Sequence, residues 1–188
     1  MLSPDRAAQH SARFVSTLLH PFLLAPLTIL VLTQDWRTAA LIAALAVLPM
    51  LVVTAIKVRR RSWSDFDVSR ASQRSGFYRI GLPIVLATGL VLARTGASPA
   101  IVRGTFTVAA LLLCALLLGR FLKTSLHMLF AAYCAVLIME AHPMATPILI
   151  VLLVALGWSR KFLKRHTLAE IVAGTALGVI GGLALVLP

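Results

Sequence analysis

The chain has 188 residues, of which 60% are hydrophobic and only 13% are charged. A soluble domain carries roughly a quarter charged residues, so the composition excludes that class and predicts an all-α, polytopic transmembrane helix bundle. The formal net charge of +12 would suggest nucleic acid in a soluble protein. Here the cations fall in short loops, so we expect membrane lipids and phosphate groups as partners, and no nucleic acid.

Seven apolar segments follow one another as candidate membrane spans. They cover about residues 14–33, 38–57, 77–94, 100–120, 126–141, 144–158 and 167–187. The sixth is short and could extend into 157–165, and the third and fourth could form a re-entrant hairpin, so we expect six or seven spans. The length allows a single integral membrane domain over residues 1–188. No small-residue cleavage site closely follows the polar start, so we expect no signal peptide.

The loops between these segments alternate between two sides of the membrane. One side holds the N-terminus, 58–76, 121–125 and 159–166, and the other holds 34–37, 95–99, 142–143 and the C-terminus. Of the 18 Lys and Arg residues, fifteen fall on the first side and three on the second. We expect the protein to be integral to the cell (inner) membrane. The positive-inside rule predicts that the first side, which holds the N-terminus, faces the cytoplasm.

Three polar clusters lie on the basic side, where ionisable residues at the edges of membrane spans are functional candidates by default. They consist of Asp65, Asp67, Arg70 and Arg74; of Lys123, Ser125 and His127; and of Ser159, Arg160, His166 and Glu170. Because loop parity places all three on one membrane face, we expect them to meet at one end of the bundle.

The third cluster contains the most specific pattern. His166 and Glu170 are four residues apart, so on one helix they share a face and can touch. A carboxylate that accepts from one imidazole nitrogen fixes the tautomer and leaves the other nitrogen as a nucleophile or base. The glycines at 174, 178 and 182 continue the same spacing and predict a seam that another helix approaches closely.

Together the clusters indicate phosphoryl transfer. Arginine forks bind phosphate oxygens and stabilise developing negative charge, while one histidine attacks phosphorus and the other protonates the departing alkoxide. The scattered acidic residues offer no cage for Mg²⁺. We therefore expect neither a metal ion nor another cofactor.

One stretch resembles a known family. SRKFLKRHTLAE, residues 159–170, is similar to the third signature of the type 2 phosphatidic acid phosphatase family, which reads Ser-Arg, five residues, His, three residues, Asp. Ser159, Arg160 and His166 match it in type and spacing, and Glu170 stands in place of the aspartate.

Two further stretches resemble the other signatures of this family in the right order. KTSLH, residues 123–127, keeps the Ser and His of Pro-Ser-Gly-His, the second signature. DVSRASQRS, residues 67–75, is the counterpart of the first signature, Lys, six residues, Arg-Pro. Arg74 takes the arginine position, while Asp67 replaces the lysine and Ser75 the proline. The resemblance covers about residues 57–187.

The resemblance implies a membrane phosphatase core of the six-helix type. His166 would become a phosphohistidine, Glu170 would orient it, and His127 would be the general acid. The implied phosphate ligands are Arg74, Arg160, Ser125 and Ser159, and Arg70 or Lys123 could replace the missing lysine. Many family members face this site outward, whereas the cation count here favours the cytoplasm.

Three functions follow as expectations. The first is a membrane lipid-phosphate phosphatase acting on a phospholipid monoester or an isoprenoid phosphate or diphosphate. The second is a lipid-binding or scaffold protein on the same fold, which the altered first and second signatures favour. The third is a lipid transporter, which the prolines at 83, 143 and 147 permit because they can break spans.

Overall fold

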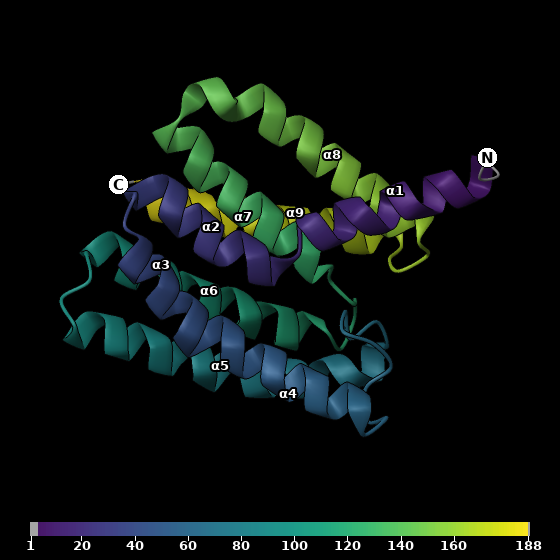
Figure 1. The fold of residues 1–188 in the computed structure, drawn as a ribbon, viewed down its shortest axis with the longest axis horizontal. Helices are drawn as coiled ribbons and strands as arrows, with labels where there is room; N and C mark the ends of the chain where they lie inside the picture. Colours follow the sequence, from purple (N-terminus) through teal and green to yellow (C-terminus); the bar gives the residue numbers. More distant parts are fainter. Residues whose placement is uncertain (1–3, 188) are drawn as a thin grey trace. The chain divides into compact units, whose positions relative to one another are not determined.

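The computed structural model describes residues 4–187, which form helices and no β-strand. In chain order the helices are α1 (Pro4–Leu18), α2 (Pro21–Thr33), α3 (Trp36–Ile42), a π-helical turn (Ala43–Val47), α4 (Leu48–Arg59), α5 (Ala71–Arg94), α6 (Pro99–Leu118), α7 (Leu126–Ala141), a 3₁₀ turn (Pro143–Ala145), α8 (Thr146–Phe162) and α9 (Leu168–Val186) (Figure 1). The all-α class predicted from the composition is thus confirmed.

The described chain divides into two compact units. The first combines the residues up to Thr28 with those from Thr124 onward, and the second runs from Ile29 to Lys123. A single domain over 1–188 stays a prediction.

Five helical segments of the described chain are long and apolar enough to cross a membrane. They are Trp36–Arg59, α5, α6, Pro143–Phe162 and α9. Helices α1 and α2 pass the same test only as a pair, bent by 52°. Helix α7 is apolar but shorter, since its 16 residues reach about 24 Å at 1.5 Å each, against a hydrocarbon core of roughly 30 Å. These helices fit a multi-pass membrane protein.

The first predicted span, 14–33, is not one continuous helix but falls within the bent pair α1 and α2. Helix α1 begins at Pro4, and the chain leaves it after Leu18. Pro21 disfavours helical geometry at the residue before it and has no N–H to donate, so a new helix starts there. His20 caps that start, because its carbonyl accepts from the Leu24 N–H at 3.0 Å and its ring Nδ1 accepts from the Phe22 N–H at 3.2 Å.

Two other predicted boundaries shift. The sixth span does not end at residue 158, because α8 continues to Phe162 and with the preceding 3₁₀ turn makes a 20-residue candidate span; this is the extension that the sequence left open. The loop predicted over 58–76 contracts to 60–70, because α5 begins at Ala71. In both places the helix includes polar and charged residues that suggest a loop. Lys, Arg and Gln are good helix formers, so they do not end the helix.

In the first unit, α7 and α9 run parallel along the predicted glycine seam. A Cβ on Gly174 would lie 2.5 Å from the Ser125 carbonyl oxygen, one on Gly178 would meet the Leu129 carbonyl oxygen, and one on Gly182 would lie 2.6 Å from the Val136 Cβ. The contacts advance together along both helices, so both begin at the same end. The close approach predicted from the spacing is confirmed, and α7 is the partner.

The rest of the first unit packs around this pair. Helix α8 contacts α7, and α1 contacts α8. An apolar cluster joins α7, α8 and α9 to the junction of α1 and α2, and Leu24 of α2 packs against it; the cluster consists of Leu19, Met128, Ala131, Leu156 and Ile171. Burial of these side chains holds the start of α2 and helices α7, α8 and α9 in one unit.

In the second unit, α5 and α6 form a hairpin, and α4 packs on α5. Gly89 allows this approach, because its Cβ would lie 3.0 Å from the ring of Phe106. Gly81 faces Met50 on α4 and Leu112 on α6 in the same way, at ordinary contact distances. The hairpin and α4 thus share a core, and the loop 60–70 joins α4 to α5.

Candidate active site

Six of the nine predicted site residues belong to the first unit, where they come from three helix ends: Ser125 and His127 at the start of α7, Ser159 and Arg160 at the end of α8, and His166 and Glu170 at the start of α9. The Ser125 N–H donates to the Glu170 carbonyl oxygen at 3.1 Å, which ties the beginnings of α7 and α9 together. Ser125 and His127 of the second polar cluster therefore lie beside the third cluster within this unit, and the meeting of all three clusters stays a prediction.

The end of α8 fixes the backbone that leads to His166. The Arg165 N–H donates to the Arg160 carbonyl oxygen at 3.1 Å and the Lys164 N–H to the Lys161 carbonyl oxygen at 3.0 Å. This is a Schellman motif, with Lys164 at φ 54° in the left-handed position that glycine usually fills. The His166 N–H also donates to the Arg160 carbonyl oxygen, at 3.3 Å.

The start of α9 fixes the side chain of His166. Thr167 is the N-cap, and its hydroxyl accepts from the Glu170 N–H at 3.3 Å. In return Glu170 Oε2 accepts from the Thr167 N–H at 3.2 Å, which completes a capping box. The same Oε2 lies 2.8 Å from His166 Nδ1.

The expected contact between His166 and Glu170 is present, but for a different reason from the one predicted. The two residues do not share a helix face, because α9 begins at Leu168 and His166 precedes its cap. Instead the carboxylate reaches back over the first turn of the helix. The sequence pattern that predicts this arrangement is Thr-x-x-Glu at residues 167–170, because this spacing is typical of a capping box.

The contact with Glu170 determines which nitrogen of His166 can react. A carboxylate only accepts hydrogen bonds, so Nδ1 must be the donor, and Nε2 carries the lone pair of the neutral ring. The His166 side chain is wholly buried and that of Glu170 is 14% exposed. A buried imidazole held in this tautomer is suited to nucleophilic attack.

Helix α1 holds the last turn of α8. Arg160 is fully buried, and its Nη1 donates to Ser16 Oγ at 2.7 Å. Ser159 is also buried, and its hydroxyl donates to the Ala12 carbonyl oxygen at 2.6 Å. The one hydroxyl proton of Ser159 is thus directed at α1, so in this structure Ser159 anchors α8, and its role as a phosphate ligand stays a prediction.

The start of α7 is built differently. Ser125 occupies the N-cap position, yet its side chain makes no capping bond. Its Oγ is buried and has no hydrogen-bond partner among residues 4–187. His127 lies in the first turn of the same helix and is 3% exposed. A helix N-terminus favours negative charge, and the start of α9 lies beside it with the same polarity, so this end of the unit suits an anion.

The other three predicted site residues, Arg70, Arg74 and Lys123, belong to the second unit. Arg74 is buried, and its Nε donates to the Val68 carbonyl oxygen at 3.1 Å. Lys123 Nζ donates to the next carbonyl, that of Ser69, at 3.3 Å. Arg70 is exposed and precedes α5.

The loop that supplies these carbonyls is tightly organised. Asp65 Oδ1 accepts from both the N–H and the hydroxyl of Ser69, at 3.2 and 2.9 Å. Val68 has φ 47°, a strained value for a β-branched residue and of a kind that concentrates at functional sites. The shared phosphate site of Arg70, Arg74 and Lys123 with His166 stays a prediction.

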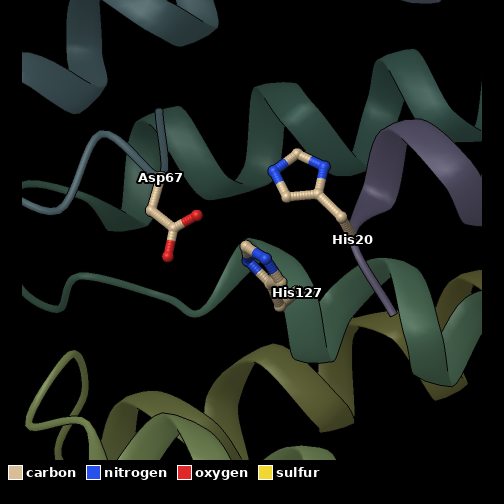
Figure 2. Close-up of side chains that lie close together, drawn as sticks. All are labelled: His20, Asp67 and His127. Atoms are coloured by element: carbon tan, nitrogen blue, oxygen red, sulfur yellow. The ribbon is translucent and has the colours of Figure 1, made fainter. Parts of the chain in front are cut away.

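His20 is a further candidate, which lies outside the three polar clusters identified in the sequence. Its ring lies against that of His127, with centroids 4.8 Å apart and planes at 86° (Figure 2). Figure 2 also labels Asp67, which belongs to the second unit. The only signal in the sequence was the His20-Pro21 pair, because a proline that opens a helix makes the residue before it the cap.

Comparison of the chain with protein-family models, curated proteins and solved structures finds no match. The side-chain contacts of the first unit and the resemblance of the three signatures are therefore the observations that bear on function.

Proposed function

We propose that the protein is a membrane lipid-phosphate phosphatase that hydrolyses a phospholipid monoester or an isoprenoid phosphate or diphosphate through a phosphohistidine at His166. One observation carries the proposal: the buried His166 ring, held through Nδ1 by Glu170 at 2.8 Å, between two capping motifs that fix the backbone on either side. The apolar helices around it would accept the lipid tail, and the signature resemblance over 57–187 supports a type 2 phosphatidic acid phosphatase core.

In the first step, His166 Nε2 attacks the phosphorus of the substrate, and the bond from phosphorus to the leaving oxygen breaks. His127 donates a proton to that oxygen, which leaves as an alcohol or, from a diphosphate, as a monophosphate. Because Nδ1 keeps its proton, the phosphorylated ring carries a positive charge, which the Glu170 carboxylate stabilises through the hydrogen bond already present.

In the second step, water attacks the phosphohistidine. His127, now neutral, accepts a proton from that water, the bond between phosphorus and Nε2 breaks, and inorganic phosphate leaves. Both residues return to their starting protonation states. The cycle requires no metal or redox cofactor.

The phosphate would be held by guanidinium groups and by the start of α7. In the first unit the candidate ligands are Arg160 and the hydroxyl of Ser125, whose burial without a partner is explained if it donates to a phosphate oxygen. Arg70, Arg74 and Lys123 are assigned by resemblance. Ser159 is also assigned as a ligand by resemblance, and to donate to a phosphate oxygen its hydroxyl would have to leave the Ala12 carbonyl oxygen.

We further propose that the site faces the cytoplasm, because the cations fall mainly on that side of the predicted topology. Substitution of the exposed Arg70 by cysteine allows a test with a membrane-impermeant thiol reagent in intact cells. Protection from the reagent, with labelling after lysis, is expected. Labelling of residue 70 from outside the intact cell contradicts this sidedness.

The function is tested by phosphate release in detergent from phosphatidic acid, an isoprenyl phosphate and an isoprenyl diphosphate. The parent should hydrolyse at least one of them, and His166→Ala should lose roughly a thousandfold or more of that activity, since removal of a nucleophile abolishes the reaction path. His142→Ala is the matched control, because His142 is exposed at the opposite end of α7.

The other outcomes identify the alternatives. Parental turnover that survives His166→Ala defeats the assignment of the nucleophile. Binding of lipid phosphates without any hydrolysis favours a lipid-binding or scaffold protein. Transfer of lipid between membrane leaflets without hydrolysis favours a transporter.

A further inference from the structure

The contact between His20 and His127 joins two elements that are distant in the sequence. His20 precedes α2, and His127 lies in the first turn of α7. Their rings are nearly perpendicular, with centroids 4.8 Å apart, and a nitrogen of one lies within 4.8 Å of a nitrogen of the other. Edge-to-face packing of this kind is a preferred geometry for aromatic rings and restricts the orientation of both.

The ring of His20 is itself fixed. Its Nδ1 accepts from the Phe22 N–H at 3.2 Å, so Nδ1 carries a lone pair and the proton of the neutral ring is on Nε2. The backbone on both sides is fixed too, because the Thr17 carbonyl accepts from the His20 N–H at 3.2 Å and the His20 carbonyl accepts from the Leu24 N–H at 3.0 Å. The His20 ring is thus held in one orientation, in which it packs against the His127 ring.

We propose that His20 is a positioning residue for the general acid, and that its ring holds the His127 imidazole in the orientation from which it protonates the departing alkoxide. The inference rests on the proposed phosphatase function and adds a residue outside the three signatures. A general acid must point its proton at the leaving oxygen, so loss of the supporting ring leaves the acid present but misdirected.

Two substitutions separate this role from helix capping. His20→Asn retains an acceptor for the Phe22 N–H, because Asn is a favoured N-cap residue, but it removes the ring. His20→Phe retains a ring against His127 but removes the acceptor. We expect His20→Asn to keep the parental melting temperature and lose activity, and His20→Phe to lose thermal stability and keep most of the activity per folded molecule.

A change of leaving group then tests whether His20 acts through the general acid. The probes are phosphatidic acid, whose alkoxide needs a proton to leave, and a nitrophenyl phosphate with an alkyl tail, whose phenolate leaves without one. kcat/KM reports the steps up to the first phosphoryl transfer, so it excludes the later hydrolysis of the phosphohistidine. His20→Asn should lower kcat/KM about 10- to 100-fold for phosphatidic acid. This loss is smaller than the rate enhancement of roughly 100- to 10,000-fold that a general acid contributes, because the acid is still present.

For the nitrophenyl substrate the same variant should stay within about twofold of the parent, because no proton is needed in that step. An equal loss on both substrates overturns the inference and makes His20 a structural residue, as does the absence of any loss. A parent that hydrolyses the isoprenyl monophosphate but not phosphatidic acid is tested with that lipid in place of phosphatidic acid, whereas a parent that hydrolyses none of these lipids defeats the proposed function, and the inference with it.

Discussion

Helices α7 and α9 begin side by side in the first unit, yet their N-termini are built in opposite ways. At α9 the Thr167 hydroxyl and the Glu170 carboxylate satisfy the first backbone donors. At α7 the N-cap Ser125 makes no capping bond, and its buried hydroxyl has no partner in the described chain. The α9 start uses its side chains to hold His166, whereas the α7 start leaves the Ser125 hydroxyl unpaired within the described residues. In the proposed function, the nucleophile His166 lies just before α9, and the α7 start binds the phosphate.

The N-termini of α7 and α9 lie side by side only if the two helices stay in contact along the glycine seam. Gly178→Ala should have the largest effect on stability, about 3 kcal/mol or more, because its Cβ would meet the Leu129 carbonyl oxygen, a backbone atom that cannot rotate away. The thermal stability of the purified variant in detergent measures this loss. Gly157→Ala is the control, since its Cβ would lie 3.7 Å from the nearest atom of Ile171, and equal losses in both variants would argue against the seam.

The charge at the start of α9 should matter more for activity than for folding. Glu170→Gln keeps a side chain that can complete the capping box and accept from His166, but removes the negative charge that stabilises the phosphorylated ring. We expect hydrolysis of the preferred substrate to fall about 100- to 1,000-fold, with an unchanged melting temperature. Glu140→Gln, at the exposed end of α7, should have no effect. Full activity in Glu170→Gln would remove the carboxylate from the mechanism.

The two N-cap residues should respond in opposite ways to the loss of their hydroxyls. Thr167→Ala should cost about 1 kcal/mol of stability, the usual value for an N-cap. Ser125→Ala should cost almost none, because its hydroxyl makes no capping bond, but it should raise KM about tenfold, the effect of roughly 1.4 kcal/mol in binding. Melting curves and substrate titrations of both variants test this contrast. If Ser125→Ala instead destabilises the protein and leaves KM unchanged, the α7 start is an ordinary cap.

The smallest effect concerns the turn that leads into His166. Lys164 has a left-handed backbone, which costs a side-chain-bearing residue about 1–2 kcal/mol, so Lys164→Gly should raise stability by up to about 1 kcal/mol after the entropic cost of glycine. Lys161→Gly removes the same charge from within α8 and should lower stability by about 1 kcal/mol. Chemical or thermal denaturation measures both, and a loss of stability in Lys164→Gly would contradict the Schellman geometry.

The same motif ends α4. There Arg61 has φ 56°, the Ser62 N–H donates to the Lys57 carbonyl oxygen, and the Arg61 N–H donates to the Val58 carbonyl oxygen, both at 2.9 Å. Arg61→Gly should therefore change stability in the same direction as Lys164→Gly.

The sequence predicted those features that depend on periodicity or local spacing. The four-residue spacing of the glycines located the helix seam, and the spacing of His166 and Glu170 predicted their contact. The capping geometry was missed, although the Thr-x-x-Glu pattern was visible, because apolar periodicity does not locate the first residue of a helix. The break at Pro21 was missed because the apolar run continues through it.

Features that depend on tertiary contacts could not be predicted. Nothing local to His20 indicates that its ring faces His127, since the two are joined only by the packing of the first unit. In the same way, the direction of the Ser159 hydroxyl toward Ala12 depends on where α1 lies. Charged residues within 71–76 and 159–162 also suggested loops, because a charge pattern alone does not distinguish a loop from the end of a helix.

Trapping of the phosphorylated protein tests the central claim most directly. Rapid quenching of the parent with a lipid substrate labelled in its phosphate should yield an acid-labile, alkali-stable adduct on His166, identified by mass spectrometry of the peptide. Glu170→Gln should form the adduct more slowly, and His166→Ala should form none. Steady hydrolysis by the parent without any adduct on His166, or with an adduct on a different residue, would contradict the account.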